Sequence, residues 1–296
     1  MKTSRLLCSM VFCFLSWQCT SEALEWIPLH EKADTLSFEE AKKYSQEKPD
    51  SLEGQYILAL VCLDKHRDNE AGAIFERILK TAPETIEAQW GKAEVLRRHH
   101  MIDESEKMFK DVIKKNPQFW PVYISLSYLS YTKKDFKKSL AFVTKVIQQH
   151  PHDVDLSTYA RAHALVGGAK GMLAYYGGPI SKMVHGFSMF KYLEKAQRLL
   201  PNSPHVLFGL GSFYFLSPAV IGGDPQKAKD YLEKAIQADP LLVDAHVRIA
   251  QLYKMQGDEE KCQEHIKKAQ ELDPKNVLLN DFLTGECEFI CASIKG

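Results

Sequence analysis

The 296-residue sequence has no net charge, because 38 basic residues balance 38 acidic ones. No overall excess of positive charge is therefore available to hold a nucleic-acid backbone or an anionic membrane. The hydrophobic fraction of 45% and the charged fraction of 26% are those of an ordinary globular chain. This balance disfavours nucleic acid as a partner.

The sequence also lacks the short motifs that mark common catalytic sites. It contains no His-Glu-x-x-His, no Gly-x-Ser-x-Gly and no P-loop. The 11 histidines are scattered along the chain, and His99-His100 falls where a turn between helices is expected. Solvated side chains explain such histidines. The sequence predicts a protein that is not an enzyme and binds no cofactor or metal.

Cysteine is scarce beyond the first residues of the chain, where only Cys62, Cys262, Cys287 and Cys291 remain. In a regular helix, Cys287 and Cys291 would lie one turn apart, with Cβ atoms about 5–6 Å from each other. A disulfide needs about 3.5–4.5 Å, so these two should not bridge. A bridge from Cys262 to the last helix and a zinc-like group with His265 are alternatives. The favoured interpretation is that these cysteines are buried, unpaired thiols.

Long apolar runs are missing except at the start, where Leu6 to Trp17 follows Lys2 and Arg5. The run is too short to span a membrane and reads as a secretory signal peptide, residues 1–23, cleaved after Ala23. The mature chain is then expected in the periplasm or secreted. A lipoprotein anchored through Cys19 is a weaker alternative, because Ser16 and Gln18 depart from the usual lipoprotein signal.

What the sequence does contain is a repeat, shown by its prolines. Seven of them lie at intervals of 34, 34, 34, 50, 39 and 34 residues: Pro49, Pro83, Pro117, Pro151, Pro201, Pro240 and Pro274. The same small and apolar residues recur in register with them, most clearly Leu210-Gly211, Tyr214, Ala228, Leu232, Ala235 and Pro240. A period of 34 residues predicts a stack of helix pairs in which each proline ends the second helix.

This pattern resembles the tetratricopeptide repeat (TPR) family. The resemblance implies an all-α, right-handed α-α superhelical solenoid with a concave groove. We expect an irregular amino-terminal helical cap over residues 24–51, a solenoid of about six helix pairs over 52–276, and a capping helix over 277–296. Small residues such as Gly211 should let paired helices approach closely.

Two segments exceed the period. Sixteen extra residues fall within 165–183, where Gly177-Gly178-Pro179 marks a turn, and five fall within 217–223. Both are either tolerated loop extensions or a surface specific to this subgroup. The candidate surface residues of the first insertion are Tyr175, Tyr176, Met183 and Phe187.

The resemblance also places one face of each first helix in the groove. The candidate partner-binding residues on that face are Tyr56, Trp90, Glu94, Arg97, Arg98, Tyr128, Tyr131, Phe208 and Phe215. On the last pair, the same register selects Val247, Gln251 and Lys254. Aromatic residues supply large contact areas, and paired arginines bind carboxylates. The alternative is that several of these aromatics pack between neighbouring repeats.

The function expected from the sequence is that of an exported, non-enzymatic scaffold. It would bind a protein or peptide partner in its groove, in the periplasm or cell envelope. The Lys-Asn-Lys set with which chaperone-binding members hold a peptide carboxylate is missing. As an alternative, Gly222-Gly223-Asp224-Pro225 is similar to the TPR component associated with TRAP-type transporters, which implies delivery of a small molecule.

Overall fold

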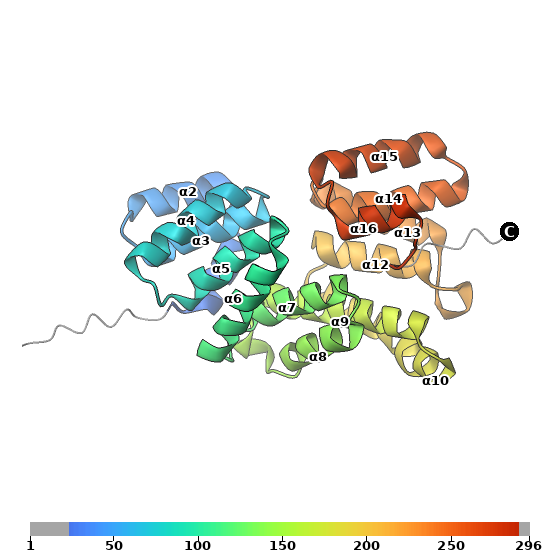
Figure 1. Cartoon of the computed structure of the whole chain (residues 1–296), viewed down its shortest axis with the longest axis horizontal. Coiled ribbons are helices and arrows are strands. Elements are labelled where there is room, and N and C mark those ends of the chain that lie inside the picture. Colours follow the sequence, from blue (N-terminus) through green and yellow to red (C-terminus); the bar gives the residue numbers. More distant parts are fainter. Residues whose placement is uncertain (1–23, 290–296) are drawn as a thin grey trace, which may run out of the picture.

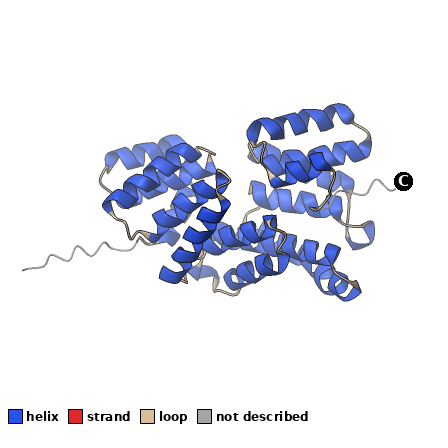
Figure 2. Ribbon diagram, in the orientation of Figure 1, coloured by secondary structure: helices blue, strands red, loops and turns tan. Residues whose placement is uncertain are grey.

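The computed structural model describes residues 24–289, and all regular elements in that range are helical. Six helix pairs follow one another along the chain (Figures 1 and 2). They are α3 (Leu52–Asp64) with α4 (Asp68–Thr81), α5 (Ile86–Arg98) with α6 (Ile102–Lys115), α7 (Pro121–Thr132) with α8 (Phe136–Ile147), α9 (Leu156–Tyr176) with α11 (Phe187–Leu199), α12 (Pro204–Leu216) with α13 (Pro225–Ala238), and α14 (Val243–Gln256) with α15 (Glu259–Leu272). The all-α solenoid fold predicted from the repeat is confirmed.

Further helices lie at the two ends of the stack and within the first insertion. Helices α1 (Trp26–Ala33) and α2 (Phe38–Glu47) precede the pairs, and α16 (Val277–Thr284) follows them. A short α10 (Pro179–Ser181) and a π-helical turn (Lys182–Gly186) connect α9 to α11. The predicted signal peptide, residues 1–23, lies outside the described residues.

Local sequence explains where the helices begin. Asp135, Asp155, Asp224 and Asp258 each stand at an N-cap and accept a hydrogen bond from a backbone N–H in the first turn. Ser37 and Glu40 form a capping box at the start of α2. These side chains satisfy amides that have no partner within the helix.

Close approach between paired helices depends on small residues. A Cβ atom at Gly211 would lie 2.7 Å from Leu232 Cγ and 3.2 Å from the Leu232 backbone nitrogen. Ala93 and Ser105 are likewise fully buried on the paired helices α5 and α6. The small positions of the repeat therefore set the spacing of the pairs, as expected.

The second insertion is shaped by its glycines. Gly222 has a φ of 103°, which favours glycine, and a Cβ at Gly223 would lie 1.8 Å from the Ser217 carbonyl oxygen. Asp224 then caps α13, with Pro225 as its first residue. Backbone geometry therefore accounts for the Gly-Gly-Asp-Pro sequence at this turn.

The carboxyl-terminal segment differs from expectation. Helix α16 ends at Thr284, because Gly285 adopts a left-handed conformation with a φ of 72°. The chain then folds back, and the Asp281 carboxylate accepts hydrogen bonds from the backbone N–H groups of Glu288 and Phe289. The Phe289 ring is buried and stacks on Tyr131 at a centroid distance of 5.9 Å.

Candidate functional site

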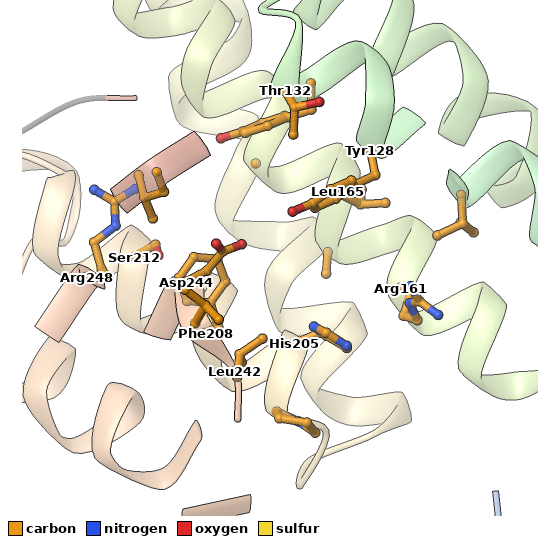
Figure 3. A pocket seen from close by; sticks show the side chains of 18 of the residues that line it. Tyr128, Thr132, Arg161, Leu165, His205, Phe208, Ser212, Leu242, Asp244 and Arg248 are labelled. Atoms are coloured by element: carbon orange, nitrogen blue, oxygen red, sulfur yellow. The ribbon is translucent and has the colours of Figure 1, made fainter. Parts of the chain in front are cut away.

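The concave side of the solenoid encloses a chamber of about 2310 Å³. The first helix of every pair contributes to its wall, as do α1 and α16. Figure 3 shows part of this wall, where side chains from α7, α9, α12 and α14 converge. One continuous space thus runs along the inner face of the repeats.

The chamber is narrowed by contacts between two arms, which we define as α1–α6 and α12–α16. His66 Nε2 lies 3.0 Å from Asp239 Oδ2, and His100 Nε2 lies 2.9 Å from Asp273 Oδ1. Each pair joins residues 173 positions apart. Both histidines occupy turns within a helix pair at φ values of 55° and 61°. The repeat therefore places equivalent histidines opposite equivalent aspartates and joins the arms, which face each other in Figure 1.

Electrostatics strengthen one of these inter-arm contacts. Burial acts to raise the pKa of Asp239, but the hydrogen bond and charge of His66 outweigh it, so the pKa lies below its ordinary value. An ionised Asp239 is thus the form that the contact favours.

The paired arginines of α5 are already engaged by acidic groups of the protein. Arg97 Nε lies 2.8 Å from Glu94 Oε2, and Arg98 Nη1 lies 2.9 Å from Asp68 Oδ1. Although burial opposes it, Arg97, Arg98 and a hydrogen bond from Ser125 lower the pKa of the Glu94 carboxyl. These two cations are largely neutralised within the wall.

Arg161, on α9, is different, and the sequence analysis did not identify it. Within the described residues it makes no hydrogen bond or ion pair, and its side chain faces the open space of the chamber (Figure 3). The side chain is exposed to that space, yet the surrounding protein encloses it and lowers the pKa of its guanidinium. Its donors are thus free for a ligand. The groove positions expected from the repeat did not include any residue of this helix pair, so Arg161 was missed.

Other titratable groups of the chamber wall include a neutral histidine and acidic side chains with raised pKa values. His205 and Asp34 are exposed to the chamber, but the surrounding protein encloses both side chains. This enclosure lowers the pKa of His205 to about 3, which keeps its imidazole neutral. Together with the charge of Asp155, it raises the pKa of Asp34 to about 6. Asn276 donates a hydrogen bond of 2.8 Å to Asp244, whose pKa is raised by burial. The chamber therefore offers an unpaired cation beside neutral donors and acidic groups.

The predicted groove residues fall into two groups, those that line the chamber and those that are buried in the core. Seven of them line the chamber: Trp90, Glu94, Arg97, Arg98, Tyr128, Tyr131 and Phe208. Tyr56 and Phe215 do not line it and are buried in the core. The Tyr56 hydroxyl lies 2.8 Å from His30 Nε2 of α1, so this cap covers it. Whether the seven residues bind a partner remains a prediction.

On the last pair, the register of the groove is displaced. Val243, Asp244 and Arg248 line the chamber in place of Val247, Gln251 and Lys254. Val247 is fully buried in a core cluster that also contains residues of α16. The cap at the end of the stack therefore covers part of the face that the repeat would leave open.

Three of the four insertion residues line the chamber. Tyr175, Met183 and Phe187 line it and are exposed, as is Tyr176. Tyr176 stacks on Phe136 at 5.9 Å, and its hydroxyl donates to the Glu288 carbonyl. The insertion thus packs on the repeats at its base and leaves its apolar tip open.

The thiols do not form the bridge weighed as an alternative. Cys62 and Cys262 are buried, free cysteines, and burial raises their pKa values. Cys287 is disulfide-bonded, so the expectation of an unpaired thiol is wrong for this residue, and it lies beyond α16 rather than in a helix. The expectation for a Cys287–Cys291 pair depends on a residue outside the described range.

One acidic group has metal-like spacing, with ligand atoms of Asp281, Glu286 and Glu288 within 4.8 Å of one another. Asp281 already accepts two backbone hydrogen bonds, and Glu288 pairs with Lys134. Two of the three carboxylates thus already have partners, and we assign the group no metal.

Among the described helices, none is both long and apolar enough to cross a membrane.

Comparison with known proteins places the chain in a structural class. A tetratricopeptide repeat family model matches residues 219–283. The human IFIT1 dimer with m7Gppp-AAAA is similar to this chain at 16% identity and a TM-score of 0.56, covering 85% of this chain and 59% of that one. A TPR protein from Parabacteroides merdae is 13% identical with a TM-score of 0.51, and the match covers 87% of this chain and 96% of that one. The Cut9–Hcn1 hetero-tetramer is 16% identical with a TM-score of 0.51, and the match covers 87% of this chain and 55% of that one.

At these identities, the likeness to solved structures shows the fold alone. No curated protein matches the sequence. The fold is that of a tetratricopeptide-repeat solenoid, and residues 219–283 match the model of that repeat. The resemblance to the TRAP-associated component finds no further support in these comparisons.

Proposed function

We propose that the protein is a non-catalytic, exported binding protein that holds a segment of a protein or peptide partner in its central chamber. The observation that carries this proposal is the continuous chamber along the first helices of all six pairs. Its volume of about 2310 Å³ exceeds the range of about 300–1,000 Å³ that is usual for small-molecule sites. A space of that volume accommodates a peptide segment.

The wall supplies the two kinds of contact that peptide recognition uses. Tyr128, Tyr131 and Phe208 offer aromatic surface, and Arg161 offers free donors for a carboxylate. Arg97 and Arg98 already have acidic partners, so Arg161 replaces them as the proposed anchor for an anionic group. The signal-peptide sequence supports action outside the cytosol, in the periplasm or cell envelope.

The test is quantitative capture of partners from the native envelope fraction. Phe208→Ala and Arg161→Ala should each weaken capture by about 2 kcal/mol, as central interface residues commonly do. Arg198→Ala is the control, because Arg198 is exposed, pairs with Glu194 and does not line the chamber. Equal capture by all three variants would refute the chamber as the binding site.

A second candidate is a small-molecule delivery protein. The observation that favours it is the reach of the chamber to Tyr175 and Met183 of the insertion. Native mass spectrometry of the purified mature protein distinguishes the two functions. A bound molecule below the mass of a peptide, lost in Phe208→Ala, supports delivery, whereas capture of a polypeptide by the same surface supports the scaffold.

A further inference from the structure

The tip of the first insertion, residues 175–187, exposes an unusual amount of apolar surface. Ile180 is 75% exposed, Met183 60%, Val184 53% and Phe187 74%. These residues stand at spacings i, i+3, i+4 and i+7, so they form one apolar stripe on a helical segment. The tip projects at α10 in Figure 1. Soluble proteins rarely expose such a contiguous patch without a partner.

Along the chain, the charged residues of the segment that carries this tip have one sign. In space, the carboxylates of Glu288 and Asp281 act on Tyr176 at the base of the tip, and Glu288 is paired with Lys134. From Leu156 to Leu193 the sequence contains no aspartate or glutamate, but it contains Arg161, Lys170, Lys182 and Lys191. Without these four cations, the rest of the chain has fewer basic than acidic residues. The overall neutrality of the protein therefore conceals a cationic segment that carries its most exposed apolar stripe.

We infer that the insertion tip docks on an anionic lipid bilayer. Apolar side chains of a projecting helix enter the boundary between headgroups and acyl chains, while lysines pair with lipid phosphates. Tyr175 and Tyr176 are placed where the tip joins the repeats, and amphipathic aromatic rings favour the interface. A fluid bilayer accepts a convex tip without a matching cavity. Since Met183 and Phe187 also line the chamber, docking brings this part of the chamber wall to the membrane.

The inference goes beyond the proposed function and does not depend on any chamber ligand. Its test is flotation of the full mature chain with vesicles of phosphatidylcholine alone or of equal parts phosphatidylcholine and phosphatidylglycerol. We expect binding to the anionic vesicles, loss of that binding as salt rises, and little binding to the neutral ones.

Variants locate the contact. Ile180→Ser with Phe187→Ser should lower partitioning to anionic vesicles at least about tenfold, because two buried apolar side chains are lost. Leu283→Ser is the matched control, since Leu283 is half-exposed on α16 and should have no effect. Circular dichroism verifies that each variant remains folded. As an independent measurement, Phe187→Trp should give a blue-shifted emission on anionic vesicles, whereas Leu283→Trp should not.

Three results would overturn the inference. They are no binding to anionic vesicles, equal binding to neutral ones, or equal binding by the double variant and the parent. A wild-type chain that self-associates through the tip, ignores vesicles, and becomes monomeric in the double variant would assign the surface to a second copy instead.

Discussion

At the scale of single residues, glycine packing gives the sharpest expectation for stability. Gly211→Leu should destabilise the fold by about 3 kcal/mol or more. A Cβ atom at this position would lie 2.7 Å from the Leu232 side chain, and the nearby Leu232 backbone leaves no room for the leucine to shift. Gly178→Ala is the control, since nothing lies within 4 Å of its Cβ position. Thermal melting measures both variants, and an unchanged midpoint for Gly211→Leu would mean that these helices are not in close contact.

His163 provides a pH-dependent test at the same scale. Both of its ring nitrogens are buried without a hydrogen bond, and burial lowers its pKa to about 4. The unfolded chain then takes up a proton below pH about 6.5, while the folded protein does not until about 4. Stability from this group is complete above pH about 6.5 and declines as the pH falls toward 4, by up to about 3 kcal/mol.

Replacing His163 should flatten that decline. The ring packs against Tyr159 at 4.8 Å and Tyr192 at 6.1 Å, so His163→Phe keeps the aromatic contacts and removes the titration. Urea unfolding at pH 7 and pH 5 measures the effect. The variant should lose less stability between the two pH values than the parent, by about 2 kcal/mol. Parallel pH profiles would contradict the assignment.

At the scale of the element, two N-cap residues allow the contribution of the cap hydrogen bond to be distinguished from that of the N-cap position itself. Asp224 accepts hydrogen bonds from the N–H groups of Gln226 and Lys227, so Asp224→Ala should cost about 1 kcal/mol. Ser203 stands at the N-cap of α12 but makes no such bond, so Ser203→Ala should cost clearly less. Equal costs in chemical denaturation would show that the cap bond at α13 contributes nothing.

The helices also show how much of the fold and of the groove could be predicted from the sequence. Proline spacing predicted the helix pairs, because a proline that ends each second helix leaves a visible period. The groove register held for α5 and α7, where neighbours on both sides are repeats. It failed for Tyr56 and for α14, because α1 and α16 cover those faces and neither cap carries the repeat pattern.

The insertion illustrates the same limit. Met172 lies within 165–183, for which a tolerated loop extension is one expectation, but it is buried in a cluster with residues of the last repeats. A shortened insertion must therefore spare Met172. Trp90 is a poor variant for binding tests for a related reason, since its indole N–H donates to Ser125 within the core. The sequence of a single repeat does not reveal such contacts between repeats.

At the scale of the whole molecule, the inter-arm contacts determine how open the chamber is. They arise from the curvature of the superhelix, which joins residues 173 positions apart and leaves no local sequence pattern. His66→Gln with His100→Gln should widen the distribution of distances between spin labels on the two arms. His152→Gln, at an exposed turn, is the control. An unchanged distribution in the double variant would show that these pairs do not hold the arms together.

The central claim is that the partner lies inside the chamber, and site-specific photo-crosslinking tests it most directly. A photoreactive phenylalanine analogue is placed at Phe208 on the chamber wall or at Lys137 on the exposed face of α8, and each protein is irradiated in the native envelope fraction. We expect a discrete cross-linked partner from position 208 and none from position 137. A cross-link from position 137 with none from position 208 would contradict the claim.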